Sequence, residues 1–263
     1  MSLYDLVKKY IADNPQISVG KIIHDDQEVW IKRRFASKEN IWHKLLHYLT
    51  FIIPFPVIYP TVVSDVTDSL LQEAMRLTLL ADNNIPVPTV LIANNEFLAT
   101  TDVGETLQRH LESIDEPGKR AYLLQQAAIA LGKLHQANLC HGRPSLRDMT
   151  YNNEQIYFID LEEDPLSVMS AAQAQARDVW LLFFSVARQC RDNPFLLNDL
   201  FSSYLHYAKP ETLGSIKKMV LFLKPIRVFV EYCLFAIPSK DLHSAVIANK
   251  TLEQNLKKHN KSN

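Results

Sequence analysis

The hydrophobic pattern of this chain changes near residue 100, and the change limits the folds open to it. Before that point, short β-branched and aromatic runs predict strands, paired as hairpins around Asp25-Asp26-Gln27 and Asn94-Asn95. Residues 3–13 and 65–83 have helical spacing. After residue 100, long apolar segments predict mostly helices, among them residues 119–138 and the almost wholly apolar residues 176–190, with one small hairpin within residues 150–160. Strands and helices do not alternate. We therefore predict an α+β, bilobal protein with a β-rich N-lobe, residues 1–100, and a helical C-lobe, residues 101–263.

Composition excludes several classes of protein. Hydrophobic residues make up 47% and charged residues 22% of the 263 residues, as in ordinary soluble globular proteins. The net charge of -1 provides no overall basic field, so we expect no nucleic-acid partner. None of the six glycines has GxGxxG or GxxxxGK[ST] spacing, which excludes a Rossmann fingerprint and a Walker P-loop. Three widely spaced cysteines favour reduced core thiols and a cytoplasmic location.

Two apolar segments, residues 42–63 and 216–238, could contact a membrane. Prolines interrupt the first and charged residues interrupt the second, so neither is expected to span a bilayer. Each combines aromatic or aliphatic side chains with nearby Lys and Arg. Two interpretations stay open for them: packing in a core or interface, and peripheral contact with the inner membrane.

Single residues suited to phosphoryl transfer occur in order along the chain. Lys32 ends the strand pattern VWIK, and Glu73 lies in the helical pattern LLQEAMRL. The run LHQANLCHGRPSLRDM follows, then a hairpin that ends in YFIDLE, with Asp160, and finally ARDVW, with Asp178. A lysine on a rigid strand can bind phosphates, and a carboxylate that follows a hairpin can hold Mg²⁺. The spacing of these patterns resembles that of the protein-kinase-like fold.

The resemblance implies a role for each of these residues. Lys32 would bind ATP phosphates and pair with Glu73, while Asp160 would be a Mg²⁺ ligand. The segment LATTDVGETL is similar to the hinge that meets adenine, which makes Asp102 a cofactor-binding candidate. Asp178 is similar to a buried aspartate that holds the catalytic loop by hydrogen bonds.

The loop HGRPSLRDM departs from the family pattern. Arg143 stands where the family has its catalytic Asp, and Asp148 stands where it has a metal-binding Asn. An arginine is not a general base at neutral pH, so we assign Arg143 to steadying the transferred phosphate or the acceptor. Asp148 keeps an oxygen ligand for metal, together with Asp160. We expect His141 to be structural, and Glu163 to lie in a solvated acidic loop.

Within the superfamily, the chain is most similar to bacterial lipopolysaccharide-core (Kdo/heptose) kinases and KEOPS-type small kinases, through its compact length, the HG of its loop and the pattern EAMRLTLLADNNIPVP. This resemblance implies a kinase that uses ATP and Mg²⁺ and phosphorylates a hydroxyl of a glycolipid, a lipopolysaccharide-core sugar or a related envelope molecule. The alternative is a pseudokinase, a nucleotide-binding scaffold without turnover, which Arg143 favours. A third interpretation is a peripheral membrane adaptor built on the two apolar segments.

Overall fold

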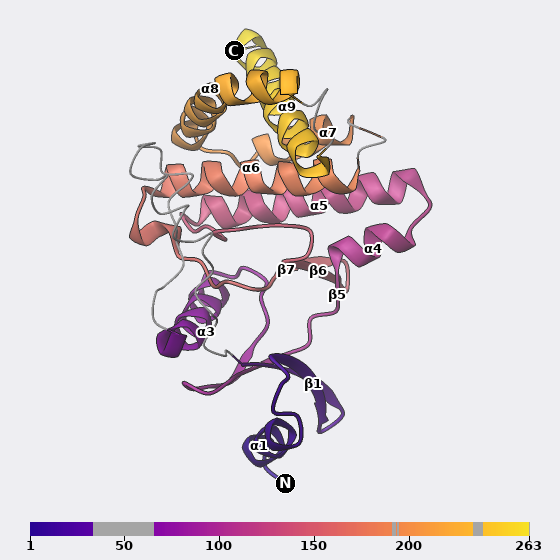
Figure 1. The fold of residues 1–263 in the computed structure, drawn as a ribbon, viewed down its shortest axis with the longest axis vertical. Helices are drawn as coiled ribbons and strands as arrows, with labels where there is room; N and C mark the ends of the chain where they lie inside the picture. Colours follow the sequence, from indigo (N-terminus) through magenta and orange to yellow (C-terminus); the bar gives the residue numbers. More distant parts are fainter. Residues whose placement is uncertain (34–65, 191–192, 194, 234–238, 263) are drawn as a thin grey trace.

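The computed structural model describes residues 1–33, 66–190, 193, 195–233 and 239–262 (Figure 1). Its strands are β1 (Val19–His24), β2 (Gln27–Lys32), β3 (Val90–Ala93), β4 (Leu98–Thr101), β5 (Glu105–Thr106), β6 (Met149–Asn152) and β7 (Gln155–Phe158). Its helices are α1 (Leu3–Asp13), α3 (Val66–Asp82), α4 (Leu107–Ser113), α5 (Pro117–Gln136), η2 (Pro165–Ser167), α6 (Ala171–Gln189), α7 (Leu196–Leu205), α8 (Pro210–Cys233) and α9 (Lys240–Ser262). The predicted α+β class, with strands first and helices after, is confirmed.

The N-terminal strands form a four-stranded antiparallel sheet in the order β1-β2-β4-β3. Its inward side chains, such as Ile31 and Phe97, pack with Val7 of α1 in a small separate core. Asp25 and Asp26 both have positive φ, as a tight hairpin turn between twisted strands requires. The predicted hairpins on either side of α3 are therefore confirmed, and β2 places Lys32 at its end.

The C-terminal half is built around α5 and α6, which run side by side beneath α7, α8 and α9 (Figure 1). Helix α6 is apolar on almost every face because it is enclosed by its neighbours, as its sequence predicts. Its start differs from the prediction: it begins at Ala171 rather than Ala176. Ser170 and Gln173 form a capping box, in which each side chain bonds the other's backbone N–H, and this fixes the earlier start.

Helix α3 connects the two halves. It contacts strands β3 and β4, and its residues Leu70 and Leu77 belong to the same large buried cluster as residues of α5 and α6. The boundary at residue 100 remains a prediction. Two elements, β5 and α4, were not predicted. Strand β5 pairs with β6, so the predicted hairpin is the major part of a three-stranded sheet.

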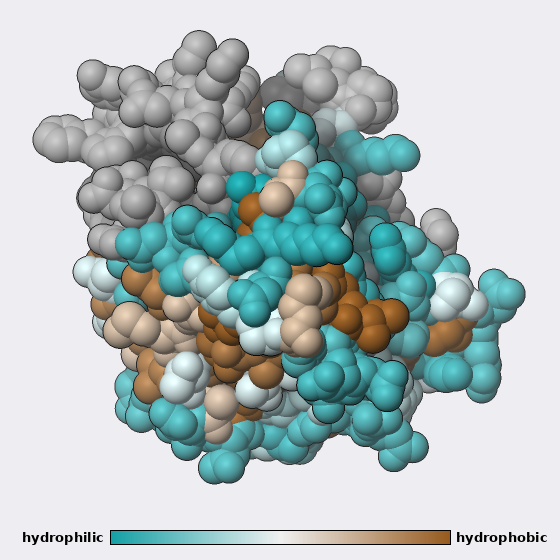
Figure 2. Space-filling view, turned by 90° about the horizontal axis from the view of Figure 1, so that it is seen from below, coloured by the Kyte–Doolittle hydropathy of each residue, from teal (hydrophilic) through white to brown (hydrophobic). Residues whose placement is uncertain are grey.

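Two expectations about surface and thiols can be compared with the described residues. Cys140 and Cys190 are buried and free, as predicted for core thiols. No helix within the described ranges is long and apolar enough to cross a bilayer. Of the two candidate membrane segments, 42–63 lies outside the described residues. The face at the α1 end carries a mixture of apolar and polar side chains (Figure 2).

Candidate active site

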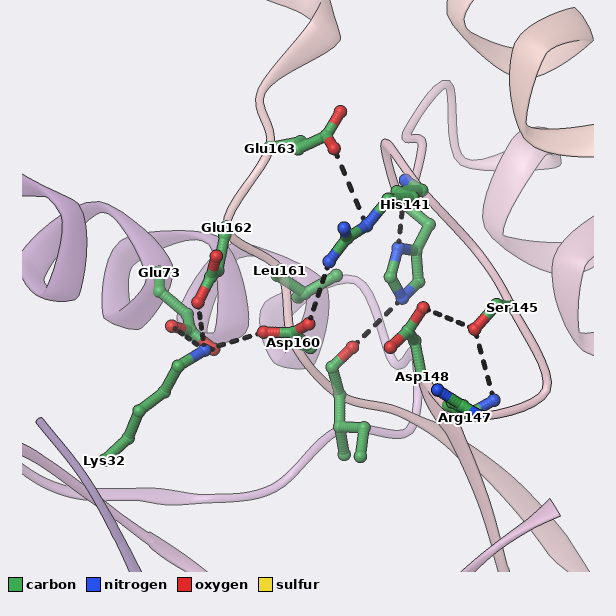
Figure 3. Close-up of polar contacts among 12 residues, drawn as sticks. Lys32, Glu73, His141, Ser145, Arg147, Asp148, Asp160, Leu161, Glu162 and Glu163 are labelled. Atoms are coloured by element: carbon green, nitrogen blue, oxygen red, sulfur yellow. Dashed lines mark hydrogen bonds and ion pairs between the residues drawn. The ribbon is translucent and has the colours of Figure 1, made fainter. Parts of the chain in front are cut away.

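Lys32 lies among three carboxylates of the described residues (Figure 3). Its Nζ is 2.8 Å from Glu73 Oε2, 2.7 Å from Asp160 Oδ1 and 2.6 Å from Glu162 Oε1. These groups come from β2, from α3 and from the loop after β7, which are far apart in the sequence. The structure therefore brings together three of the predicted site residues and adds Glu162, which the sequence analysis missed.

The charges of this cluster stabilise one another. Burial by itself lowers the pKa of Lys32, but the three carboxylates outweigh it and hold the pKa above its ordinary value. Burial raises the pKa of Asp160, yet Lys32 and then Arg143 outweigh burial, so the pKa of Asp160 is lowered. The pKa of Glu73 is raised, because burial outweighs the attraction of Lys32. Lys32 is therefore a permanent cation at the end of β2.

Asp160 has a left-handed backbone conformation. Its φ of 62° lies in a region that most non-glycine residues seldom adopt and that Asp tolerates better than most. The turn directs the Asp160 carboxylate back toward Lys32 on the sheet (Figure 3).

Arg143 reaches the same carboxylate from the opposite loop. Its Nη2 lies 3.3 Å from Asp160 Oδ2, and its Nε lies 3.6 Å from Glu163 Oε1. Glu163 also accepts a hydrogen bond from Arg177 at 2.6 Å, and its side chain is only 12% exposed. The expectation that Glu163 belongs to a solvated loop is therefore wrong, because two guanidinium groups hold it at the site.

Asp148 lies beside this cluster, directly before the first residue of β6. Ser145 Oγ donates to Asp148 Oδ2 at 2.7 Å, and the backbone N–H of Ile159 donates to the Asp148 carbonyl at 3.0 Å (Figure 3). Burial raises the pKa of Asp148 despite the hydrogen bond from Ser145. Asp148 as a metal ligand stays a prediction. Among the described residues, the ligand atoms of Glu73, Asp160 and Glu162 lie within 4.8 Å of one another.

Asp178, in the middle of α6, holds the loop that carries Arg143. Its fully buried carboxylate accepts from the backbone N–H of His141 at 2.6 Å and of Gly142 at 2.9 Å. His141 is itself buried, with Nε2 3.1 Å from the carbonyl oxygen of Ile159, and burial lowers its pKa. Both residues are structural, as predicted.

Arg76 is a site residue that the sequence analysis missed. It donates from α3 to four backbone carbonyls, those of Cys140 (2.8 Å), His141 (3.2 Å), Leu161 (3.0 Å) and Glu163. These carbonyls belong to the loop before β6 and the loop after β7. The one available signal was its place three residues after Glu73, which puts both side chains on neighbouring faces of one helix.

A cavity of about 380 Å³ opens beside the cluster, a volume within the range of ligand sites. Its lining combines apolar residues, such as Leu77, Leu98 and Val103, with the charged residues Lys32 and Asp160. Asp102 does not reach it. Its carboxylate accepts hydrogen bonds from Trp30 Nε1 and the Gly104 N–H, pairs with Lys21 at 3.3 Å, and lines a neighbouring cavity.

Comparisons with known proteins give a relative and a weak structural likeness. No family model matches the chain. A solved structure of the gentamicin–APH(2")-IIa complex matches over 97% of this chain and 99% of that chain, with 11% identity and a TM-score of 0.43, a level that supports no assignment.

A protein of Haemophilus influenzae, described as uncharacterized, is 34% identical over 222 residues. The match covers 84% of this chain and 82% of that protein. The chain therefore belongs to the same family as this Haemophilus influenzae protein.

Proposed function

We propose that this protein is a kinase-like phosphotransferase that moves the γ-phosphate of ATP to a hydroxyl group. The observation that carries the proposal is the convergence of Lys32, Glu73 and Asp160 in a cavity whose other lining residues are largely apolar. Phosphoryl transfer needs little covalent chemistry from the protein and depends on positioning and charge neutralisation. Lys32 and the carboxylates around it can provide charge neutralisation, and the cavity beside them can position the nucleotide.

The residues present fit ATP and Mg²⁺. The apolar lining from the predicted hinge segment, which includes Leu98 and Val103, suits an adenine ring. Lys32 would bind the phosphates and Glu73 would hold Lys32 in place. Asp160, with Glu162 or Asp148, offers carboxylate oxygens, which are the ligands Mg²⁺ prefers. Mg²⁺ bound there would neutralise charge on the phosphates.

Arg143 and Asp148 would together replace the catalytic aspartate that the loop lacks: Arg143 would stabilise charge, and Asp148 would orient the acceptor. The Arg143 guanidinium lies 3.3 Å from Asp160, so it can steady the charge on the transferred phosphate. Where Glu162 completes the metal site with Asp160, the Asp148 carboxylate can instead orient an acceptor hydroxyl, because it lines the same cavity as Asp160.

A pseudokinase is the second candidate function, and Arg143 is the observation that favours it. An arginine in direct contact with the Asp160 carboxylate could also compete with a metal ion for that carboxylate. A nucleotide-binding scaffold would tolerate this contact, whereas an enzyme would have to exploit it. Nucleotide binding is common to both candidates, and turnover separates them.

Binding of ATP with Mg²⁺ should raise the melting temperature. A ligand at 100 times its Kd adds about 2.7 kcal/mol to the free energy of unfolding. For a chain of this size that corresponds to a rise of roughly 5–10 °C. Lys32→Met should lose most of the rise, since it removes the phosphate-binding cation, and Lys8→Met, at an exposed lysine of α1, should keep it. Differential scanning fluorimetry with 5 mM ATP measures this. An unchanged melting temperature in the wild type would contradict both candidates.

The acceptor in our proposal is a glycolipid, a lipopolysaccharide-core sugar or a related envelope molecule, met at the cytoplasmic face of the membrane. One face of α8 supports this choice. It exposes apolar side chains at helical spacing, with lysines before and beside them: Leu221, Val228, Phe229, Tyr232, Lys217, Lys218 and Lys224. An apolar stripe with flanking cations matches the chemistry of an anionic lipid surface.

If α8 contacts lipid, the protein should sediment with phosphatidylglycerol vesicles and less so with phosphatidylcholine vesicles. Adding salt should weaken the binding, because part of it is electrostatic. The double variant Phe229→Ser/Tyr232→Ser should lower vesicle affinity about tenfold by removing two side chains that would enter the interface. Tyr122→Ser, at an exposed tyrosine of α5, is the matched control. Equal sedimentation with both lipids would rule out this contact.

A further inference from the structure

A second cavity, of about 420 Å³, adjoins the one beside Lys32. Its walls are the loop from Arg143 to Asp148, one side of α6 and Gln108 of α4. Arg147 and Asp148 line both cavities, so the two meet at these residues. A group bound in the second cavity would therefore lie next to the Asp148 carboxylate.

The charge of this cavity is unlike that of the chain as a whole. Among the described residues that line it, Arg143, Arg147 and Arg188 are cationic, and Asp148 is the one acidic residue. The whole chain, in contrast, has a net charge of -1. A net positive cavity at the edge of a site indicates an anionic ligand, because the focused field raises the local concentration of anions.

The contacts that the three guanidinium groups make within the protein are long, exposed or made to a neutral partner. Arg143 is 54% exposed, and its contacts with Asp160 and Glu163 are 3.3 and 3.6 Å long. Arg188 pairs with Asp241 at 3.3 Å on the open surface, where an ion pair contributes little. Arg147 donates from Nε to Gln108, a neutral side chain. All three guanidinium groups can therefore donate hydrogen bonds to a bound anion.

The rest of the lining consists of four polar residues, Gln108, Ser145, Ser185 and Gln189, and an apolar part. Pro144, Leu146, Leu181 and Phe184 form this apolar part, and the ring of Phe184 stacks on Trp180 with 5.7 Å between centroids. The N–H of Leu146 donates to Ser185 Oγ at 3.0 Å, which fixes the loop to α6. The cavity thus offers a rigid apolar wall, suited to a sugar ring or other organic body, next to its cations.

We propose that this cavity binds the phosphate acceptor, and that the acceptor carries an anionic group, a phosphate or a carboxylate, near the hydroxyl that reacts. The proposal deepens the kinase function and rests on it for the transfer step. In that step the acceptor oxygen bonds to the γ-phosphorus. The bond from this phosphorus to the bridging oxygen breaks, and its electron pair leaves with ADP. The hydroxyl proton is released to solvent.

Three forms of one sugar test the charge preference: glucose 6-phosphate, glucuronate and glucose. Calorimetric titration at low ionic strength should show binding of one or both anionic sugars and at least tenfold weaker binding of glucose. Comparing the affinities of glucose 6-phosphate and glucuronate shows whether the cavity prefers a phosphate or a carboxylate. Each titration is repeated with a saturating non-hydrolysable ATP analogue and Mg²⁺, and binding of the anionic sugar should persist. Equal binding of all three sugars, or no binding of either anion, would overturn the proposal.

Variants locate the bound anion. Arg147→Gln and Arg188→Gln should each weaken binding of the anionic sugar about fivefold, while Arg188→Lys should restore part of it. Lys250→Gln removes the same charge from an exposed site on α9 and should bind as the wild type does. Melting temperatures confirm that each variant is folded. Binding that Lys32→Met abolishes and the arginine variants keep would place the sugar phosphate in the first cavity and overturn the proposal.

The test is independent of the kinase function. Anion binding that responds to Arg147 and Arg188, without any thermal shift by ATP, would support the cavity and contradict the proposed function. A thermal shift by ATP, with anion binding insensitive to both arginines, would contradict this inference alone.

Discussion

Asp160→Asn should lower phosphoryl transfer by roughly 10³-fold, the size of effect seen when one fixed electrostatic contact to a transition state is removed. The substitution keeps the shape of the side chain. It removes the negative charge that lies 2.7 Å from Lys32 and 3.3 Å from Arg143, and it removes one hard oxygen ligand. The measurement is transfer of label from γ-labelled ATP to an envelope-glycolipid extract, with ATP binding followed by thermal shift in parallel.

Asp164→Asn is the matched control. It makes the same change four residues along the same loop, at a position outside the Lys32 cluster and the cavity beside it. We expect its transfer to stay within about twofold of the wild type, since isolated surface substitutions have small effects. Wild-type transfer no higher than that of Asp160→Asn, with ATP still bound, would end the enzyme proposal in favour of the pseudokinase.

Asp178→Ala should lower the free energy of unfolding by about 3–5 kcal/mol, because breaking a buried charged contact leaves its partners unsatisfied. The carboxylate is fully buried and accepts the N–H groups of His141 and Gly142 at 2.6 and 2.9 Å. Removing the carboxylate leaves both buried N–H groups without this acceptor. At about 2–4 °C per kcal/mol, the melting temperature should fall by roughly 10 °C.

Two further variants test the reason for that loss. Asp178→Asn keeps one oxygen acceptor but turns an amide NH₂ toward the second N–H, so its stability should fall between those of wild type and Asp178→Ala. Asp241→Ala removes a carboxylate that is 60% exposed, and it should change stability by less than about 1 kcal/mol. Urea unfolding measures all three. A loss in Asp178→Ala no greater than in Asp241→Ala would contradict the role given to Asp178.

The sequence was informative wherever a residue followed a local pattern. Lys32 could be predicted because it ends an alternating strand, and Asp160 because it follows a hairpin. Glu73 could be predicted because it lies on a long amphipathic helix after that strand. The resemblance to the protein-kinase-like fold implied that Lys32 pairs with Glu73, and the two side chains form an ion pair 2.8 Å long.

The sequence was uninformative where tertiary contacts decide what a residue does. Glu162 and Glu163 follow Asp160 in an acidic run whose composition is typical of a solvated loop. Their partners, Lys32, Arg143 and Arg177, come from three different elements. A local sequence pattern does not show contacts between elements that are far apart in the chain. The same is true of Asp102, whose partners Trp30 and Lys21 lie on strands β2 and β1.

The contacts of Arg76 have a consequence for how this site can change over evolutionary time. Arg76 binds the main-chain oxygens of four residues in two loops, so it recognises the path of the backbone and is indifferent to the side chains carried there. The side chains of Cys140 and Leu161 are buried in the core, so the positions that can change are their exposed neighbours in the two loops. The loops can therefore acquire new side chains, and with them new acceptors, while a single arginine on α3 preserves their geometry.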